Sequence, residues 1–174
     1  MNPDPAPSRR PGVVGRKSES TTAGARLVLT LQNAAPDAKV PSKADLRRWA
    51  KAALAVSDTP RDEVTVRLVG EAESAELNQH YRGKNGPTNV LSFPFEDPPG
   101  VTTTLLGDLV ICAPVVNREA DEQHIPPADH WAHILVHGML HLLGYDHVRD
   151  ADAQVMEPLE TRILGGLGVQ DPYA

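Results

Sequence analysis

The segment His137–His147 constrains the fold of this chain most strongly, because it places three histidines within eleven residues. His137 and His141 are four positions apart, so on a helix both imidazoles project from one face, one turn apart. A helix offers two imidazoles to one metal ion in this way. Gly144 can adopt the left-handed conformation that ends a helix, and the turn after it can return His147 toward the other two histidines. The spacing predicts a metal site with three imidazoles and one open position, as in catalytic zinc sites.

The helix expected from residue 128 to 143 strengthens this prediction, because it is apolar on most sides and should be buried: Trp131, Ile134, Leu135, Gly138, Leu142. Histidines on a buried helix need partners for their polar nitrogens. His133, His137 and His141 form a straight stripe whose ends lie ~12 Å apart at 1.5 Å per residue, which suits one ion poorly. A ligand from beyond the turn closes around an ion better. We therefore choose His137, His141 and His147 as ligands of one zinc ion, with His133 as a supporting or packed residue.

The histidine pattern invites comparison with zinc proteases of the H-E-x-x-H type, whose glutamate acts as the general base. Here that position is Gly138, so a peptidase of this type lacks its base. A metal that activates water and polarises an oxyanion would still suit phosphodiester hydrolysis, which also needs positive charge near the phosphoryl oxygens. Arg82, in a glycine-rich turn beside Lys84, is the best candidate, because a guanidinium can grip a phosphate with two hydrogen bonds. The alternative is that Arg82 is an ordinary surface residue.

Composition limits the classes of partner and location. The net charge of the 174 residues is 17 − 23 = −6, so no chain-wide positive field attracts nucleic acid and any contact must use a local basic patch. Lys43, Arg47 and Lys51 form a basic stripe that we interpret as a solvated helix face. The single cysteine, Cys112, excludes an intrachain disulfide and is expected to be a small buried residue. No apolar run approaches the ~18 residues that span a bilayer, so we expect no membrane association and a cytoplasmic location.

Two parts of the chain differ in composition. Residues 1–24 are rich in Pro, Ser and Gly and are expected to be a disordered extension, whereas residues 25–174 should form a single domain. Strands are expected at 26–32, 63–69, 88–93 and 105–112, and helices at about 42–56, 71–81, 114–123, 128–143 and 150–164. Their irregular order predicts an α+β fold with a single small mixed sheet of about four strands, helices packed on it and the metal-binding helix central.

The last of these helices contains Pro158, which should kink or split it. Its expected inner face is apolar: Val155, Met156, Leu159, Ile163.

Three blocks of sequence, in this order, resemble the YbeY family of bacterial endoribonucleases and rRNA maturation factors: Tyr81–Pro94, Leu105–Cys112 and His137–His147. The last reads H-G-x-L-H-L-x-G-Y-D-H, and the resemblance extends from about residue 26 to Tyr173. It implies a zinc-dependent, single-strand-specific endoribonuclease that acts in 16S rRNA 3′-end maturation and ribosome quality control. It also implies single-stranded RNA and ribosomal or small-subunit assembly partners, with no DNA.

By the same resemblance, His137, His141 and His147 are the zinc ligands and Arg82 is the functional arginine of the family. The attacking group stays open between water activated at the metal and the 2′-OH of the substrate. No general base is evident, and Asp146 could equally orient a histidine. The alternative function is a non-catalytic ribosome-assembly factor with a structural zinc, against which the open coordination position argues.

Overall fold

The computed structural model of the chain describes residues 26–146 and 150–173. The predicted extension 1–24 and His147 lie outside these residues. The elements in chain order are β1 (Val28–Asn33), α1 (Lys43–Leu54), β2 (Glu63–Val69), α2 (Glu71–Arg82), β3 (Val90–Pro94), β4 (Leu105–Cys112), α3 (Ala113–Glu122), α4 (Pro127–Leu142) and α5 (Asp150–Gly166). Each strand and helix expected from the sequence is present, with ends that differ by a few residues.

One sheet of four strands, in the order β1-β2-β4-β3, organises the fold. β1, β2 and β4 are parallel, and β3 pairs antiparallel with β4. The parallel pairs are connected through helices, as parallel strands require. β3 is therefore an edge strand, and the sheet is mixed. The predicted α+β class with a single mixed sheet of about four strands is confirmed.

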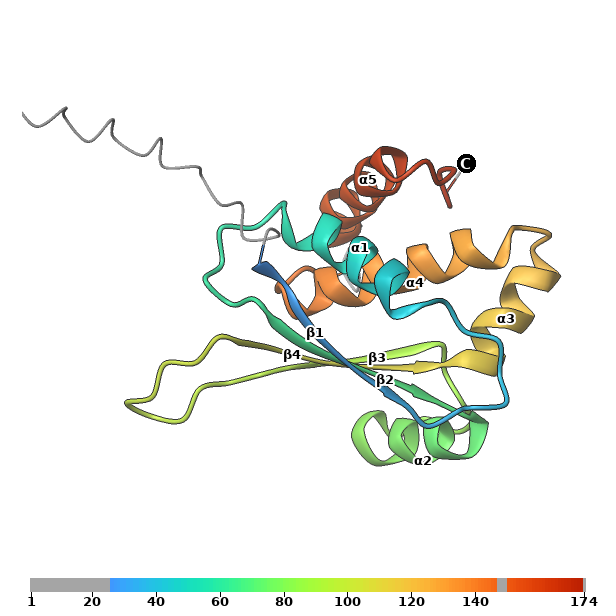
Figure 1. Ribbon diagram of the computed structural model, residues 1–174, viewed down its shortest axis with the longest axis horizontal. Helices are drawn as coiled ribbons and strands as arrows, with labels where there is room; N and C mark the ends of the chain where they lie inside the picture. Colours follow the sequence, from blue (N-terminus) through green and yellow to red (C-terminus); the bar gives the residue numbers. More distant parts are fainter. Residues whose placement is uncertain (1–25, 147–149, 174) are drawn as a thin grey trace, which may run out of the picture.

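The two faces of the sheet are covered unequally, as Figure 1 shows: α1, α4 and α5 lie on one side and α2 lies on the other. The main core fills the first side and includes the fully buried Leu46, Val66 and Leu135. A smaller cluster under α2 contains Val69, Leu91, Val110, Cys112 and Val115. Cys112 is a buried strand residue, as predicted. Because α2 covers one part of its face, polar residues of β1 and β2 remain accessible there.

α4 is the most apolar helix, and most of its side chains are buried. It contacts α1, α3, α5, β3 and β4, so the helix that carries the histidines lies at the centre of the packing, as predicted. Among the described helices, none is both long enough and apolar enough to cross a membrane.

α4 approaches the sheet closely at Gly138. A Cβ at this position would lie 2.9 Å from Cδ2 of Leu109 and 3.3 Å from Cγ2 of Val90. The hydroxyl of Ser92 on β3 donates a hydrogen bond of 3.2 Å to the carbonyl of Gly138. A side chain at this position would have to displace the buried Leu109 and Val90, so packing favours glycine here over the glutamate that zinc proteases place at this position.

α5 differs from its prediction in its inner face. Of the two outcomes expected at Pro158, a kink or a split, the split does not occur: the helix runs from Asp150 to Gly166 with Pro158 inside. Pro158 and Gln154 are exposed, so water can satisfy the carbonyl that loses its helical partner. Val155, expected on the inner face, is 58% exposed, whereas Glu160 is completely buried. The turn of α5 that faces the core thus contains a carboxylate.

We predict that Gly107→Ala lowers the free energy of unfolding by about 3 kcal/mol. Gly107 has φ = 151°, and a Cβ would lie 2.4 Å from the carbonyl oxygen of Phe93, which backbone pairing holds in place. Urea denaturation measures the loss. Gly165→Ala is the matched control: nothing lies within 4 Å of its Cβ position, so helix propensity should stabilise that variant by up to about 1 kcal/mol. Equal effects at both positions would contradict this account.

Candidate active site

The side chains of His137 and His141 meet at the surface of α4. Their Nε2 atoms lie 3.1 Å apart. Two nitrogens bound to one tetrahedral zinc ion at 2.0–2.1 Å lie ~3.3 Å apart, so the pair already has the separation that a shared ion requires. The four-residue spacing on one helix produces this geometry, as the sequence predicts.

A buried carboxylate stands behind these histidines. Glu160 of α5 is 0% exposed, and its Oε1 lies 2.5 Å from Nδ1 of His137. Its Oε2 lies 3.2 Å from Nε2 of His133 and accepts a 2.6 Å hydrogen bond from the hydroxyl of Tyr173. Three polar groups therefore converge on one carboxylate, which explains how α5 buries a charge.

His133, His137 and Glu160 bring ligand atoms within 4.8 Å of one another, so among the described residues this group could hold a metal ion. The 2.5 Å separation of Nδ1 and Oε1, however, is that of a strong hydrogen bond and is short for two ligands of one ion. If Nδ1 of His137 donates to Glu160, its Nε2 keeps a lone pair directed at Nε2 of His141. Carboxylates commonly orient metal-binding histidines in this way, so the contacts favour an ion at the paired Nε2 atoms.

The ionisation of this network fits that role. Burial by itself would raise the pKa of Glu160, but hydrogen bonds from His133, His137 and Tyr173 outweigh it and lower the pKa to about 2. Burial and the neighbouring Glu160 carboxylate raise the pKa of Tyr173 far above its usual value, so its hydroxyl keeps its proton. Glu160 is thus an anionic acceptor and Tyr173 a neutral donor at neutral pH.

Arg82 is positioned by the end of α2. Gly83 follows it with φ = 64° and ends the helix in the left-handed conformation, as a C-terminal glycine does. The amide of Asn78 donates to the carbonyl of Gly86 at 2.9 Å. The hydroxyl of Ser74 exchanges two 3.0 Å hydrogen bonds with the backbone of Thr88. The glycine-rich turn is therefore tied to α2 on both sides, which fixes where Arg82 leaves the helix.

Arg82 and the two histidines share one groove of about 640 Å³. Its lining comes from the end of α2, from β3 and the residues before it, and from the exposed side of α4: Tyr81, Arg82, Thr88, Asn89, Val90, Leu91, Ser92, Phe93, Pro94, His137, His141, Asp146. Two sequence blocks that are some fifty residues apart thus meet across the edge strand. The groove combines a guanidinium with a pair of imidazoles whose Nε2 atoms face each other.

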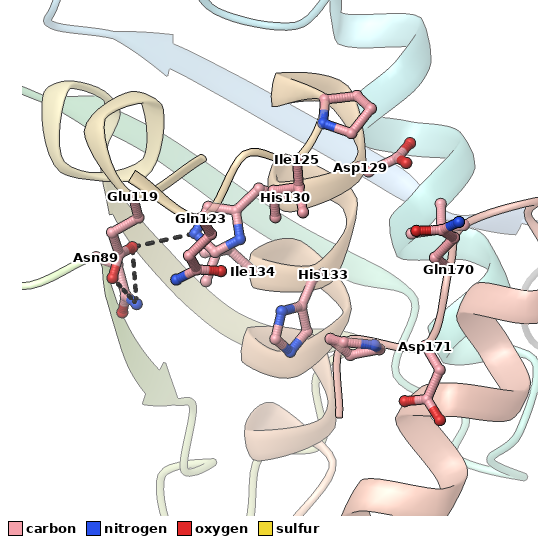
Figure 2. A pocket seen from close by; sticks show the side chains of 13 residues that line it. Asn89, Glu119, Gln123, Ile125, Asp129, His130, His133, Ile134, Gln170 and Asp171 are labelled. Atoms are coloured by element: carbon pink, nitrogen blue, oxygen red, sulfur yellow. Dashed lines mark hydrogen bonds and ion pairs between the residues drawn. The ribbon is translucent and has the colours of Figure 1, made fainter. Parts of the chain in front are cut away.

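A second hollow of about 760 Å³ lies between α3, α4 and the C-terminal segment, and Figure 2 shows its side chains. Its lining includes the carboxylates of Glu119, Asp129 and Asp171. Burial raises the pKa of Glu119, but hydrogen bonds from His130 and Asn89 lower it by more, so this carboxylate is ionised at neutral pH. The acidic lining repels phosphate, so the smaller groove at Arg82 suits a phosphodiester better, although the acidic hollow is larger.

The structure brings together three of the four predicted site residues and does not describe the fourth. His137, His141 and Arg82 lie in one groove with Asp146, whereas His147 lies outside the described residues. Sequence reasoning assigned no role to Glu160, which contacts His133 and His137, or to Tyr173, which donates to Glu160. Glu160 follows Met156 by four residues, and Met156 was expected on the inner face of the helix. This spacing could have indicated that Glu160 is buried. His130 is buried, and its Nε2 lies 3.2 Å from Oε1 of Glu119.

Comparisons with known proteins relate most of the chain to one family. A family profile described as Endoribonuclease YbeY matches residues 30–168. A protein of Methylococcus capsulatus named Endoribonuclease YbeY is 60% identical over 145 residues, covering 83% of this chain and 94% of that protein. A protein of the same name from Alteromonas mediterranea is 58% identical over 134 residues, covering 77% of this chain and 85% of that one.

The fold is also similar to that of a solved structure. The solution structure of TM1509 from Thermotoga maritima superimposes with a TM-score of 0.52 at 23% identity, covering 80% of this chain and 91% of that one. This likeness concerns the fold alone.

We predict that Glu160→Gln weakens zinc binding by about 10- to 100-fold, the usual cost of losing a carboxylate that orients a metal ligand. A glutamine has one acceptor oxygen in place of two and cannot serve both imidazoles. Competition with a chromophoric chelator measures the affinity. Glu157→Gln, one turn earlier on α5, is the matched control because, among the described residues, no hydrogen bond joins its side chain to His133, His137 or His141. Equal zinc affinity in both variants would show that Glu160 does not orient the site.

Proposed function

The chain belongs to the endoribonuclease YbeY family, and from this premise we propose that it is a zinc-dependent, single-strand-specific endoribonuclease. The residues assigned to one zinc ion are His137, His141 and His147, and Arg82 binds the scissile phosphate. When bound, the zinc supplies positive charge to the phosphoryl oxygens and lowers the pKa of water. The proposed biological roles are 16S rRNA 3′-end maturation and ribosome quality control in the cytoplasm, with rRNA and small-subunit assembly factors as partners.

One observation carries this proposal: Arg82 and the Nε2 pair of His137 and His141 line the same groove. A phosphodiester in the groove can receive two hydrogen bonds from the guanidinium while its other side faces the imidazoles. Arg82 is exposed, so it can reach a substrate without first breaking into the core. Glu160 holds His137 in one tautomer, and Tyr173 holds Glu160. The protein thus arranges positive charge at the phosphate before the substrate arrives.

The groove also supports the preference for single strands. It is formed by a strand edge, a helix end and a helix face rather than by a broad basic surface, and Arg82 is the only cationic lysine or arginine in its described lining. An RNA duplex presents its phosphates over a wide surface and hides its bases, whereas a single strand can place one phosphate at a single guanidinium. This local positive charge reconciles RNA binding with a net charge of −6.

The alternative, a non-catalytic assembly factor with a structural zinc, is disfavoured by exposure. Structural zinc sites are usually closed by four protein ligands. The side chains of His133 and His137 are 19% and 20% exposed, and both His137 and His141 line the groove. An ion at the paired Nε2 atoms would therefore be accessible to a substrate.

We predict that Arg82→Glu lowers RNA cleavage by at least about 100-fold, because a preorganised charge at the phosphate becomes a repulsive one. Zinc content and melting temperature should stay unchanged, since Arg82 is exposed. The assay uses an unstructured single-stranded RNA with labelled ends. Arg48→Glu, the same charge change at an exposed site on α1, should cleave RNA normally. If the Arg82 variant cleaves RNA as fast as the wild type, Arg82 does not bind the scissile phosphate.

We further predict that His141→Ala loses zinc and RNA cleavage together, because one of the two facing imidazoles is removed. Metal content and cleavage are measured on the same sample, before and after chelator treatment, with added zinc restoring the wild type. His124→Asn, at an exposed histidine with φ = 55°, is the control and should keep both properties. A His141 variant that contains no zinc and is fully active would contradict the assignment of a catalytic metal.

The same assay identifies the attacking group. If the 2′-OH of the substrate attacks, products carry cyclic phosphate ends and a deoxy-substituted linkage is not cut. If water attacks, the deoxy-substituted linkage is still hydrolysed.

A further inference from the structure

Tyr81 is the most exposed large apolar side chain in the described part of the chain, at 60%. It occupies the last turn of α2, directly before Arg82. An aromatic ring loses little conformational freedom when a ligand binds, and it gains a large contact area when a flat ligand covers it. Phosphate binding at Arg82 does not explain why an exposed aromatic ring lies directly beside it.

The ring of Tyr81 is held between two others. Its centroid lies 4.6 Å from that of His80 at an interplanar angle of 87°, and 4.9 Å from that of Phe93 at 66°. Both contacts are edge-to-face arrangements, which are the favourable geometry for aromatic pairs. The ring is therefore oriented before any ligand binds, although most of its surface is exposed.

Tyr81 and Phe93 stand between two hollows and line both of them. One is the groove with Arg82, His137 and His141. The other, of about 560 Å³, lies over the part of the sheet that α2 leaves uncovered. A strand whose phosphate is at Arg82 needs to pass the aromatic pair to continue onto this sheet face.

The second hollow suits a nucleobase and not a phosphate. Arg67 is the single cationic side chain among the described residues that line it, and Glu73 already holds the guanidinium with bonds of 2.6 and 2.8 Å. Its other polar groups are uncharged or acidic, including Gln32, Thr65 and Asp108. Such groups offer hydrogen bonds to base edges, while no free positive charge is directed at a phosphate.

We propose that Tyr81, supported by Phe93, is a stacking platform for a base of single-stranded RNA, adjacent to the phosphate bound at Arg82. This inference rests on the proposed function. Single-strand-binding proteins combine a charged groove with aromatic rings on which bases stack, and that is the combination found here. The stacked base is directed into the sheet-face hollow, where its edge meets Gln32, Thr65 and Asp108. Tyr81 is a binding residue in this account and takes no part in bond cleavage.

The test compares Tyr81→Ala with Tyr81→Phe in steady-state cleavage of an unstructured single-stranded RNA. Tyr81→Ala should raise KM about 10-fold, as the loss of one stacked base does, with kcat unchanged. Tyr81→Phe keeps the ring and should restore the wild-type KM. Phe95→Ala removes a 37% exposed ring that lines neither hollow and should have no effect. Equal KM in Tyr81→Ala and wild type would overturn the proposal.

Abasic substrates add a second, independent measurement. An abasic nucleotide moved along the RNA should lower kcat/KM of the wild type at one position beside the cleaved linkage. Tyr81→Ala should be insensitive at that position, because the stacking partner is already gone. Additive losses from the variant and the abasic nucleotide would contradict a direct stack.

A tryptophan reporter follows the contact directly. Trp49 and Trp131 are 3% and 1% exposed, so their emission should not respond to a surface ligand. In Tyr81→Trp the new indole is exposed, and stacking on a base should quench its emission when the RNA is added. No quenching, despite cleavage of the same RNA, would overturn the proposal and leave the proposed function intact. If wild-type protein with zinc cleaves no RNA, the proposed function itself fails.

Discussion

The close contact of α4 with the sheet at Gly138 positions the histidines of α4 relative to the edge strand β3. Without a side chain at this position, the helix lies against Leu109 and Val90, and Ser92 bonds to its backbone. The same approach brings the exposed side of α4 to the edge strand β3. His137 and His141 therefore face the groove that Arg82 enters from the other side. A larger residue at 138 would have to displace the side chains of Leu109 and Val90.

Glu160 adds the second constraint. Its buried carboxylate joins α5 to two turns of α4 and, through Tyr173, to the end of the described chain. A buried anion is stable only when donors surround it, so each of these groups fixes the others. With the carboxylate as acceptor, His137 donates through Nδ1 and turns Nε2 toward His141. Local folding in this part of the molecule is thus coupled to the orientation of the imidazole that we assign to the metal.

The unequal covering of the sheet connects these constraints to RNA. The face under α1, α4 and α5 forms the main core and is closed to ligands, whereas α2 leaves part of the other face accessible (Figure 1). Arg82 and Tyr81 both lie at the end of α2, at the border between the groove and the open face. One helix terminus therefore presents a guanidinium and an exposed aromatic ring side by side, the groups to which we assign the phosphate and the base of a nucleotide.

The sequence by itself determined the secondary structure, the α+β class and the pairing of His137 with His141, because these depend on local periodicity and spacing. It also singled out Arg82 through its glycine-rich turn. It failed where distant segments decide the environment, because Val155 is exposed and Glu160 is buried. The family resemblance had already assigned Arg82 and the histidines to one site, and the tertiary structure shows that they line one groove. Only the tertiary structure joined Glu160 to His137, because that contact arises from the packing of one helix on another and has no periodic pattern in the chain.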